Sequence, residues 1–166
     1  LLVDLKLVRR LPPWSGNLGK RLTRSPKVYI RDGGLVHALL ELETAHDLAG
    51  HPVAGPSYEG MAIETLIAAA GERRQPYFFR SQDGAEIDLL FEFGGKPDLA
   101  IEVKRASAPN LDKGFSIACN DLGIRQRYVV YPGQERYPLR YGAEAIPLPR
   151  LSELLSMPPK SISYVK

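Results

Sequence analysis

Apolar and polar residues alternate along several short segments in the second half of the chain, which is the pattern of half-buried β-strands. Between them lie two longer stretches with apolar residues three and four positions apart, as in amphipathic helices. The predicted order is helix 57–71, strand 77–80, hairpin 85–104, helix 111–122, strand 127–131, a weak edge strand 145–148 and a short helix 151–155. This order, αβββαβ with small additions, indicates an α/β fold around a central mixed sheet.

The first third of the chain has a different character. Strands are predicted at 5–11 and 27–31, joined by a basic loop, after what reads as a helix end at 1–4. This arrangement is typical of the wing of a winged helix. A short helix at 35–42 and a connector at 43–56 follow, so we expect residues 1–56 to be a winged-helix remnant with its connector, 57–156 the main domain and 157–166 a tail.

The hairpin carries charged residues on otherwise apolar strands. A two-residue turn at Gly94-Gly95 would pair Asp88 with Ile101 and separate Asp88 from Glu102, because side chains alternate across a strand. A three-residue turn pairs Asp88 directly with Glu102 and places Lys104 on the same face. We expect the second register, since it gathers the apolar side chains on one face. An ordinary solvated charged face remains the alternative.

The helix predicted at 57–71 carries another carboxylate. Ser57 is the expected N-cap and Gly71 the expected stop. Glu59 lies four residues before Ile63, on the inward apolar stripe, and Glu64 should point elsewhere. A carboxylate on a buried stripe is costly unless it is paired or binds a metal. The alternative is that Glu59 interacts favourably with the helix dipole in the first turn.

Composition narrows the class of protein. The chain has 166 residues, 44% hydrophobic, enough for one globular domain. Its single cysteine, Cys119, excludes an internal disulfide, fits a reducing cytoplasmic location, and is expected in the core. No apolar run is long enough to span a membrane. The chain begins within an apolar pattern without an initiator methionine, so we expect it to be part of a longer protein.

Charge is distributed unevenly. The net charge is +3, but residues 6–31 contain eight Lys and Arg and no Asp or Glu, so the remainder is net acidic. A basic block suits a polyanion such as DNA, although a solvated loop rim would have the same composition. The candidate phosphate contacts are Lys20, Arg21, Arg24 and Lys27.

The order αβββαβ, with Glu59, then Asp88, then Glu102-x-Lys104, resembles the PD-(D/E)XK nuclease superfamily, which includes restriction endonucleases. The resemblance implies a restriction-endonuclease-like fold and catalytic roles for these four residues. Mg²⁺ or Mn²⁺ would be held by Asp88, Glu102 and the carbonyl of Val103, and Lys104 would orient the attacking water. Many such nucleases act as dimers, which leaves a homo-oligomer open.

A second resemblance covers most of the chain. Through the segments 19–22, 25–29, 58–60, 84–88 and 101–104, the chain resembles a C-terminal domain of unknown function of prokaryotic AAA-type P-loop ATPases. This resemblance implies an ATPase module earlier in the same protein as a partner. The chain has no P-loop motif, so ATP binding is not expected within it. Two functions follow as expectations: metal-dependent cleavage of DNA, or a catalytically inactive nucleic-acid- or protein-interaction and regulatory module of the ATPase.

Overall fold

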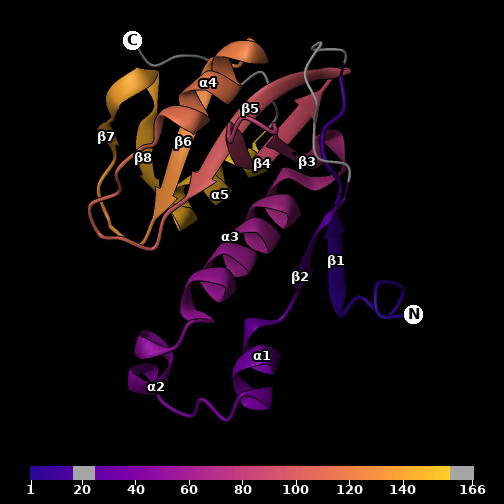
Figure 1. The fold of residues 1–166 in the computed structure, drawn as a ribbon, viewed down its shortest axis with the longest axis vertical. Coiled ribbons are helices and arrows are strands. Elements are labelled where there is room, and N and C mark those ends of the chain that lie inside the picture. The colour runs from indigo at the N-terminus through magenta and orange to yellow at the C-terminus, as the bar shows by residue number, and fades with distance from the viewer. Residues whose placement is uncertain (17–24, 158–166) are drawn as a thin grey trace.

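The computed structural model describes residues 1–16 and 25–157 and contains a mixed sheet with helices on both faces (Figure 1). The helices are α1 (Gly33–Leu39), α2 (Ala45–Gly50), α3 (Ala54–Ala70), α4 (Lys113–Asp121) and α5 (Leu148–Ser156), with 3₁₀ turns η1 (Gly71–Arg73) and η2 (Arg140–Gly142). The strands are β1 (Val8–Leu11), β2 (Lys27–Ile30), β3 (Gln75–Arg80), β4 (Glu86–Phe93), β5 (Lys96–Val103), β6 (Gln126–Tyr131), β7 (Tyr137–Pro138) and β8 (Glu144–Pro147).

The main sheet has the strand order β3-β4-β5-β6-β8-β7. The pairs β3–β4, β4–β5 and β7–β8 are antiparallel, and β5–β6 and β6–β8 are parallel. The order α3-β3-β4-β5-α4-β6 along the chain is the predicted αβββαβ order. The strand expected at the sheet edge near 145–148 lies inside the sheet instead, because the short strand β7 covers it.

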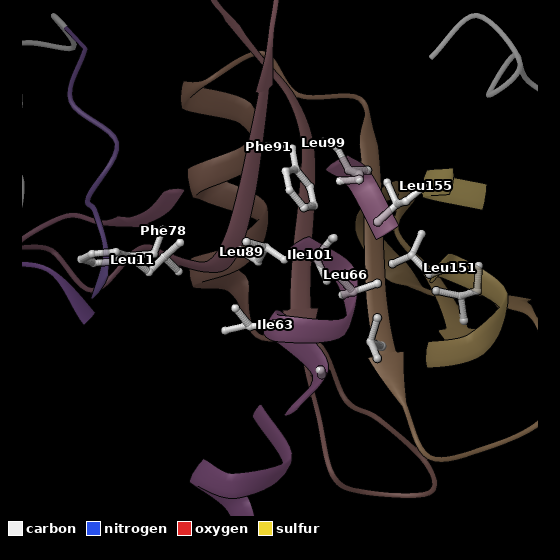
Figure 2. Packing of buried hydrophobic residues seen from close by; sticks show 14 residues of the cluster. Leu11, Ile63, Leu66, Phe78, Leu89, Phe91, Leu99, Ile101, Leu151 and Leu155 are labelled. Carbon is white, nitrogen blue, oxygen red and sulfur yellow. The ribbon is translucent and has the colours of Figure 1, made fainter. Parts of the chain in front are cut away.

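Two apolar clusters hold helices against the sheet. One contains Leu89, Phe91 and Ile101 from the central strands together with residues of α3 and α5 (Figure 2). The other contains Leu90 and Ala100 with residues of α4. Both faces are therefore buried, whereas the sequence predicted one apolar face and one charged face.

The β4–β5 hairpin reaches the expected pairing by an unexpected route. Its turn has two residues, Gly94 and Gly95, with φ of 60° and 76°, and Phe93 pairs with Lys96. Two consecutive positive φ values are what a tight type I′ turn needs, and glycine adopts them at no steric cost. A β-bulge at Asp98 then shifts the register by one residue, so that Leu89 pairs with Ile101. The predicted three-residue turn is wrong, but the register next to Asp88 is the predicted one.

A further bulge lies beside Asp88 itself. On the other side of β4, Tyr77 pairs with Leu90 but Phe79 pairs with Ile87, so β4 holds one extra residue between them. The bulge turns Ile87 into the α4 cluster, away from Leu89. Such an extra residue re-aims neighbouring side chains. Simple alternation therefore fails in the segment that carries Asp88.

Helix α3 starts three residues earlier than predicted, at Ala54, and Ser57 does not cap it. The Ser57 hydroxyl instead lies 2.8 Å from Nε2 of His37. The end at Gly71 is confirmed, because Gly71 is the C-cap with φ of 62°. The predicted connector at 43–56 holds α2, which begins with a capping box between Thr44 and Asp47.

The N-terminal strands pair as an antiparallel ribbon, with Val8 opposite Ile30. The ribbon is attached to the main sheet, since Leu11 is fully buried in the α3 cluster and the Trp14 amide donates to the Phe78 carbonyl at 2.7 Å. Residues 1–4 form a turn and not the predicted helix end. Within the described residues, no helix is both long and apolar enough to cross a bilayer.

Candidate functional site

The ammonium group of Lys27 lies at the centre of a cluster of carboxylates. Its Nζ is 3.0 Å from Oε1 of Glu86, 3.1 Å from Oδ1 of Asp88 and 3.3 Å from Oε1 of Glu59. Only 16% of the Lys27 side chain and 13% of Asp88 are exposed. We call these four residues the Lys27 cluster. It joins the ribbon strand β2, the helix α3 and the strand β4 into one charged site.

Strand alternation explains why Lys27 points inward. In the four-residue strand β2, Val28 and Ile30 are exposed, and Lys27 and Tyr29 take the other face. The Tyr29 hydroxyl donates to Oε1 of Glu59 at 2.6 Å. The Tyr29 ring also lies over Gly60, where an added Cβ would be 3.4 Å from Cδ1 of the ring. Strand β2 thus packs directly against α3 at Gly60.

The electrostatics of the cluster favour charged groups. Although burial disfavours the charged ammonium, the carboxylates of Asp88 and Glu59 hold the pKa of Lys27 above its ordinary value. Burial likewise opposes ionisation of Glu86, but hydrogen bonds from Arg80 and Lys27 bring the pKa of Glu86 below its ordinary value. Arg80 lies 2.5 Å from Glu86 at the more exposed side. Lys27 and Arg80 thus oppose three carboxylates.

Glu102 and Lys104 form a second ion pair next to the Lys27 cluster. The Nζ of Lys104 is 2.8 Å from Oε1 of Glu102 and 3.5 Å from Oδ2 of Asp112, the N-cap residue of α4. Burial and the nearby charge of Asp88 raise the pKa of Glu102 to about 7, against the opposing effect of Lys104. Asp88 links the two groups, because its Oδ2 accepts a 3.1 Å hydrogen bond from the Val103 N–H.

The structure thus divides the four predicted catalytic residues between two ion-pair groups. Glu59 and Asp88 are bound to Lys27, whereas Glu102 is bound to Lys104. Glu64 points elsewhere, as predicted, and is paired with Arg9 and Arg31. Val103, expected to offer a carbonyl to a metal, is engaged with Asp88 through its N–H.

In the Lys27 cluster the lysine ammonium takes the position of a cation. An ammonium already lies 3.0–3.3 Å from an oxygen of each of the three carboxylates, where Mg²⁺ would need oxygens at about 2.0–2.1 Å. Across residues 1–16 and 25–157, no group of three or more His, Cys, Asp or Glu side chains has the arrangement of metal ligands. The acids of the Lys27 cluster have an internal cation as their partner.

The expected phosphate contacts have different outcomes. Lys20, Arg21 and Arg24 lie outside the described residues. Lys27 is largely buried and bound to carboxylates, so it does not present its charge to solvent as a phosphate contact would. Sequence reasoning missed Tyr29 and Glu86 as members of the site. The signal for Tyr29 was the alternation within β2, which places it beside Lys27, and the signal for Glu86 was its position two residues before Asp88 on the same strand.

Comparison with known proteins gives family matches but no activity. Residues 54–151 match the family described as Domain of unknown function (DUF4143), and residues 1–46 match Domain of unknown function (DUF8612). Two relatives are 41% identical over 146 residues: uncharacterized protein Mb2031c of Mycobacterium bovis and uncharacterized protein Rv2008c of Mycobacterium tuberculosis. The match covers 88% of this chain but 33% of each relative, so the chain spans about a third of their length. No solved structure shows a significant match.

Proposed function

The chain belongs to the DUF4143 family, and on this premise we propose that it is a non-catalytic protein-interaction module of a longer protein that carries a P-loop ATPase. In this proposal the domain keeps the αβββαβ order of a PD-(D/E)XK nuclease, but its acids hold a lysine in place of a metal ion. The ATPase belongs to the proposal through the family resemblance and through the relatives, which are about three times as long as the matched segment.

The contacts of Lys27 are the observation on which the non-catalytic proposal depends. One ammonium within 3.3 Å of three carboxylates competes with Mg²⁺ or Mn²⁺ for the same oxygens and offsets part of their negative charge. An exposed lysine loses side-chain entropy when it is held in an ion pair. Lys27 is already largely buried, so it loses little more by binding the carboxylates. The cluster therefore stabilises the junction between the ribbon and the domain.

The distribution of exposed apolar side chains favours a role in protein interaction. Within the described part of the chain, ten of the fifteen exposed large apolar side chains lie in residues 1–40. They include Val28 and Ile30, on the face of the ribbon opposite Lys27. An exposed apolar face, such as that formed by Val28 and Ile30, is typical of protein interfaces. We assign this face to the part of the longer polypeptide that lies outside the matched third.

Plasmid nicking tests the absence of catalysis. Purified protein incubated with supercoiled plasmid and Mn²⁺ or Mg²⁺ should leave the plasmid intact, and calorimetric titration with Mn²⁺ should give no stoichiometric binding. Nicking that disappears in Asp88→Ala, but persists in the exposed-residue control Asp83→Ala, would overturn the proposal and favour a metal-dependent nuclease. Salt-sensitive DNA binding without cleavage would instead identify nucleic acid as the partner.

The interaction itself is tested with the relative from Mycobacterium tuberculosis. The portion of that protein outside the match, mixed with this chain, should co-elute with it in size-exclusion chromatography. The double substitution Val28→Lys and Ile30→Lys should separate the two species. Ile117→Lys, at an exposed apolar position on α4, is the matched control and should leave the complex intact. Co-elution that survives the β2 substitutions would refute this assignment of the face.

A further inference from the structure

A cavity of about 630 Å³ lies between α1, α2 and the first half of α3, and its lining includes none of the residues of the Lys27 cluster. Figure 1 shows α1 and α2 beside the N-terminal end of α3, at a distance from the central sheet. Pockets for small organic molecules in proteins have volumes of about 300–1,000 Å³. The cavity is therefore large enough for a molecule with one or two rings.

The lining of the cavity is mainly apolar. Leu48 of α2 contributes to one wall, and Ala54 and Met61 of α3 contribute to the other. Met61 is 44% exposed, although it lies in the longest helix of the domain. Methionine is flexible and polarizable, so it adapts to ligands of different shape. These side chains would cover the apolar body of a bound molecule.

A hydrogen-bonded pair supplies polar groups in the same cavity. Nε2 of His37 lies 2.8 Å from Oγ of Ser57, and both residues line the cavity. Gly33 permits this approach of α1 to α3, because a Cβ on Gly33 would be only 3.1 Å from the Ser57 hydroxyl oxygen. A bound molecule can exchange hydrogen bonds with this pair.

Of the charged residues that line the cavity, Arg105 has no acidic partner among the described residues. Glu64 is bound by Arg31 at 2.7 Å and also by Arg9. Asp32 accepts hydrogen bonds from the backbone amides at the start of α1, including Gly34 N at 2.8 Å. Arg105 also lines the cavity, and it has no ion pair with any described residue. Both acids thus have partners, whereas the Arg105 guanidinium is free to bind an anion.

We propose that this cavity binds a small organic anion, an apolar ring system carrying a carboxylate or a phosphate. The ring system packs against Leu48 and Met61, and the anionic group lies against Arg105. Charge-assisted hydrogen bonds to a guanidinium fix the orientation of such an anion. The site is independent of the Lys27 cluster and of the proposed interaction face at Val28 and Ile30.

Naphthyl phosphate and naphthylacetate are suitable probes for this site. We expect both to shift backbone amide NMR signals of residues around the cavity, with naphthyl phosphate binding at least about tenfold more tightly than inorganic phosphate or naphthol. The Arg105→Gln substitution should weaken binding of the anionic probes about tenfold, and it should leave the affinity for naphthol unchanged. The ratio between the two anions distinguishes a phosphate site from a carboxylate site.

Two further variants make the test decisive. Met61→Trp should fill the cavity and abolish binding of all ring-containing probes. Because Met61 is 44% exposed, we expect this variant to fold. Arg125→Gln removes a different exposed arginine as a matched control and should change nothing. The proposal is refuted if neither anion binds more tightly than inorganic phosphate. It is equally refuted if binding persists in Met61→Trp, or if Arg125→Gln weakens it as much as Arg105→Gln.

Discussion

Replacing Lys27 with methionine tests whether the Lys27 cluster is a structural element. The substitution keeps much of the aliphatic length and removes the ammonium, so it leaves Glu59, Glu86 and Asp88 facing one another. Any two of the contacting oxygens lie within about 6.6 Å, because each is within 3.3 Å of the same nitrogen. At an effective dielectric constant of about 20, two such charges repel by roughly 2.5 kcal/mol.

Two features reduce the expected loss of stability. Arg80 remains bound to Glu86, and both Glu59 and Glu86 are about one-third exposed, so solvent screens part of the repulsion. Removing one partner of a fully buried ion pair costs about 3–5 kcal/mol. For Lys27→Met we therefore expect a loss of about 2–4 kcal/mol in the free energy of unfolding at neutral pH.

The pH dependence gives the prediction its specificity. Lys27 contributes to the lowered pKa of Glu86, so its stabilising effect is complete above the ordinary carboxyl pKa and is lost as the acids become protonated. The difference between wild type and Lys27→Met should therefore shrink when the pH falls from about 7 to about 4. Adding Asp88→Asn to Lys27→Met should recover part of the loss at neutral pH, because it removes one of the unpaired charges.

Urea denaturation followed by circular dichroism measures these effects. Lys96→Met is the matched control, because Lys96 is exposed and has no ion pair with a described residue; its effect should stay below about 0.5 kcal/mol. A Lys27→Met loss no larger than that of the control would refute the structural role. A loss that is the same at both pH values would show that the cost is one of packing and not of charge.

Three further predictions follow from single contacts. Glu102→Gln should stabilise the protein at pH 8, by on the order of 2 kcal/mol in the free energy of unfolding, but not at pH 5. The reason is that a carboxyl whose pKa is raised to about 7 destabilises the folded state when it ionises. Urea denaturation at the two pH values measures this, and equal effects at both would contradict it. Gly114→Ala should lower the free energy of unfolding by about 1–3 kcal/mol, since the new Cβ would lie 2.9 Å from the Gly84 carbonyl oxygen. Gly55→Ala has open space around its Cβ and should raise the free energy of unfolding by about 0.5–1 kcal/mol in the same assay. Cys119 is fully buried and burial raises the pKa of its thiol to about 12, so Ellman's reagent should react with it only after unfolding; rapid reaction with the native protein would contradict its burial.

The element order was predictable because each segment has a clear hydrophobic period. The end of α3 was equally predictable, since Gly71 adopts the positive φ that suits a helix stop. The start was not, because Ser57 is a good N-cap in isolation but bonds to His37, twenty residues earlier in the chain. Where a side chain has two possible hydrogen-bond partners, tertiary packing determines which one it binds, and the local sequence does not reveal that choice.

The hairpin shows how a wrong local step can lead to a correct register. The pattern of apolar residues required Asp88 opposite Glu102, whereas a regular two-residue turn at the glycines would place Ile101 opposite Asp88. The bulge at Asp98 reconciles the two requirements. The carboxylate of Asp98 is itself held by Arg74 and Gln126, at 3.4 Å and 3.2 Å. Both residues are distant in sequence, so the bulge could not be deduced from the hairpin alone.

The content of the charged site was the least predictable feature, for a physical reason. A pattern of three carboxylates indicates a place of negative potential, and that potential attracts any cation of suitable size. Lys27 looked like a surface residue because seven other basic residues lie in the same block of the sequence. Its burial depends on the β2 strand lying against α3, which brings together residues more than thirty positions apart. The same acid pattern is therefore compatible with a metal ion or with an internal lysine, and only the path of the ribbon decides which cation it holds.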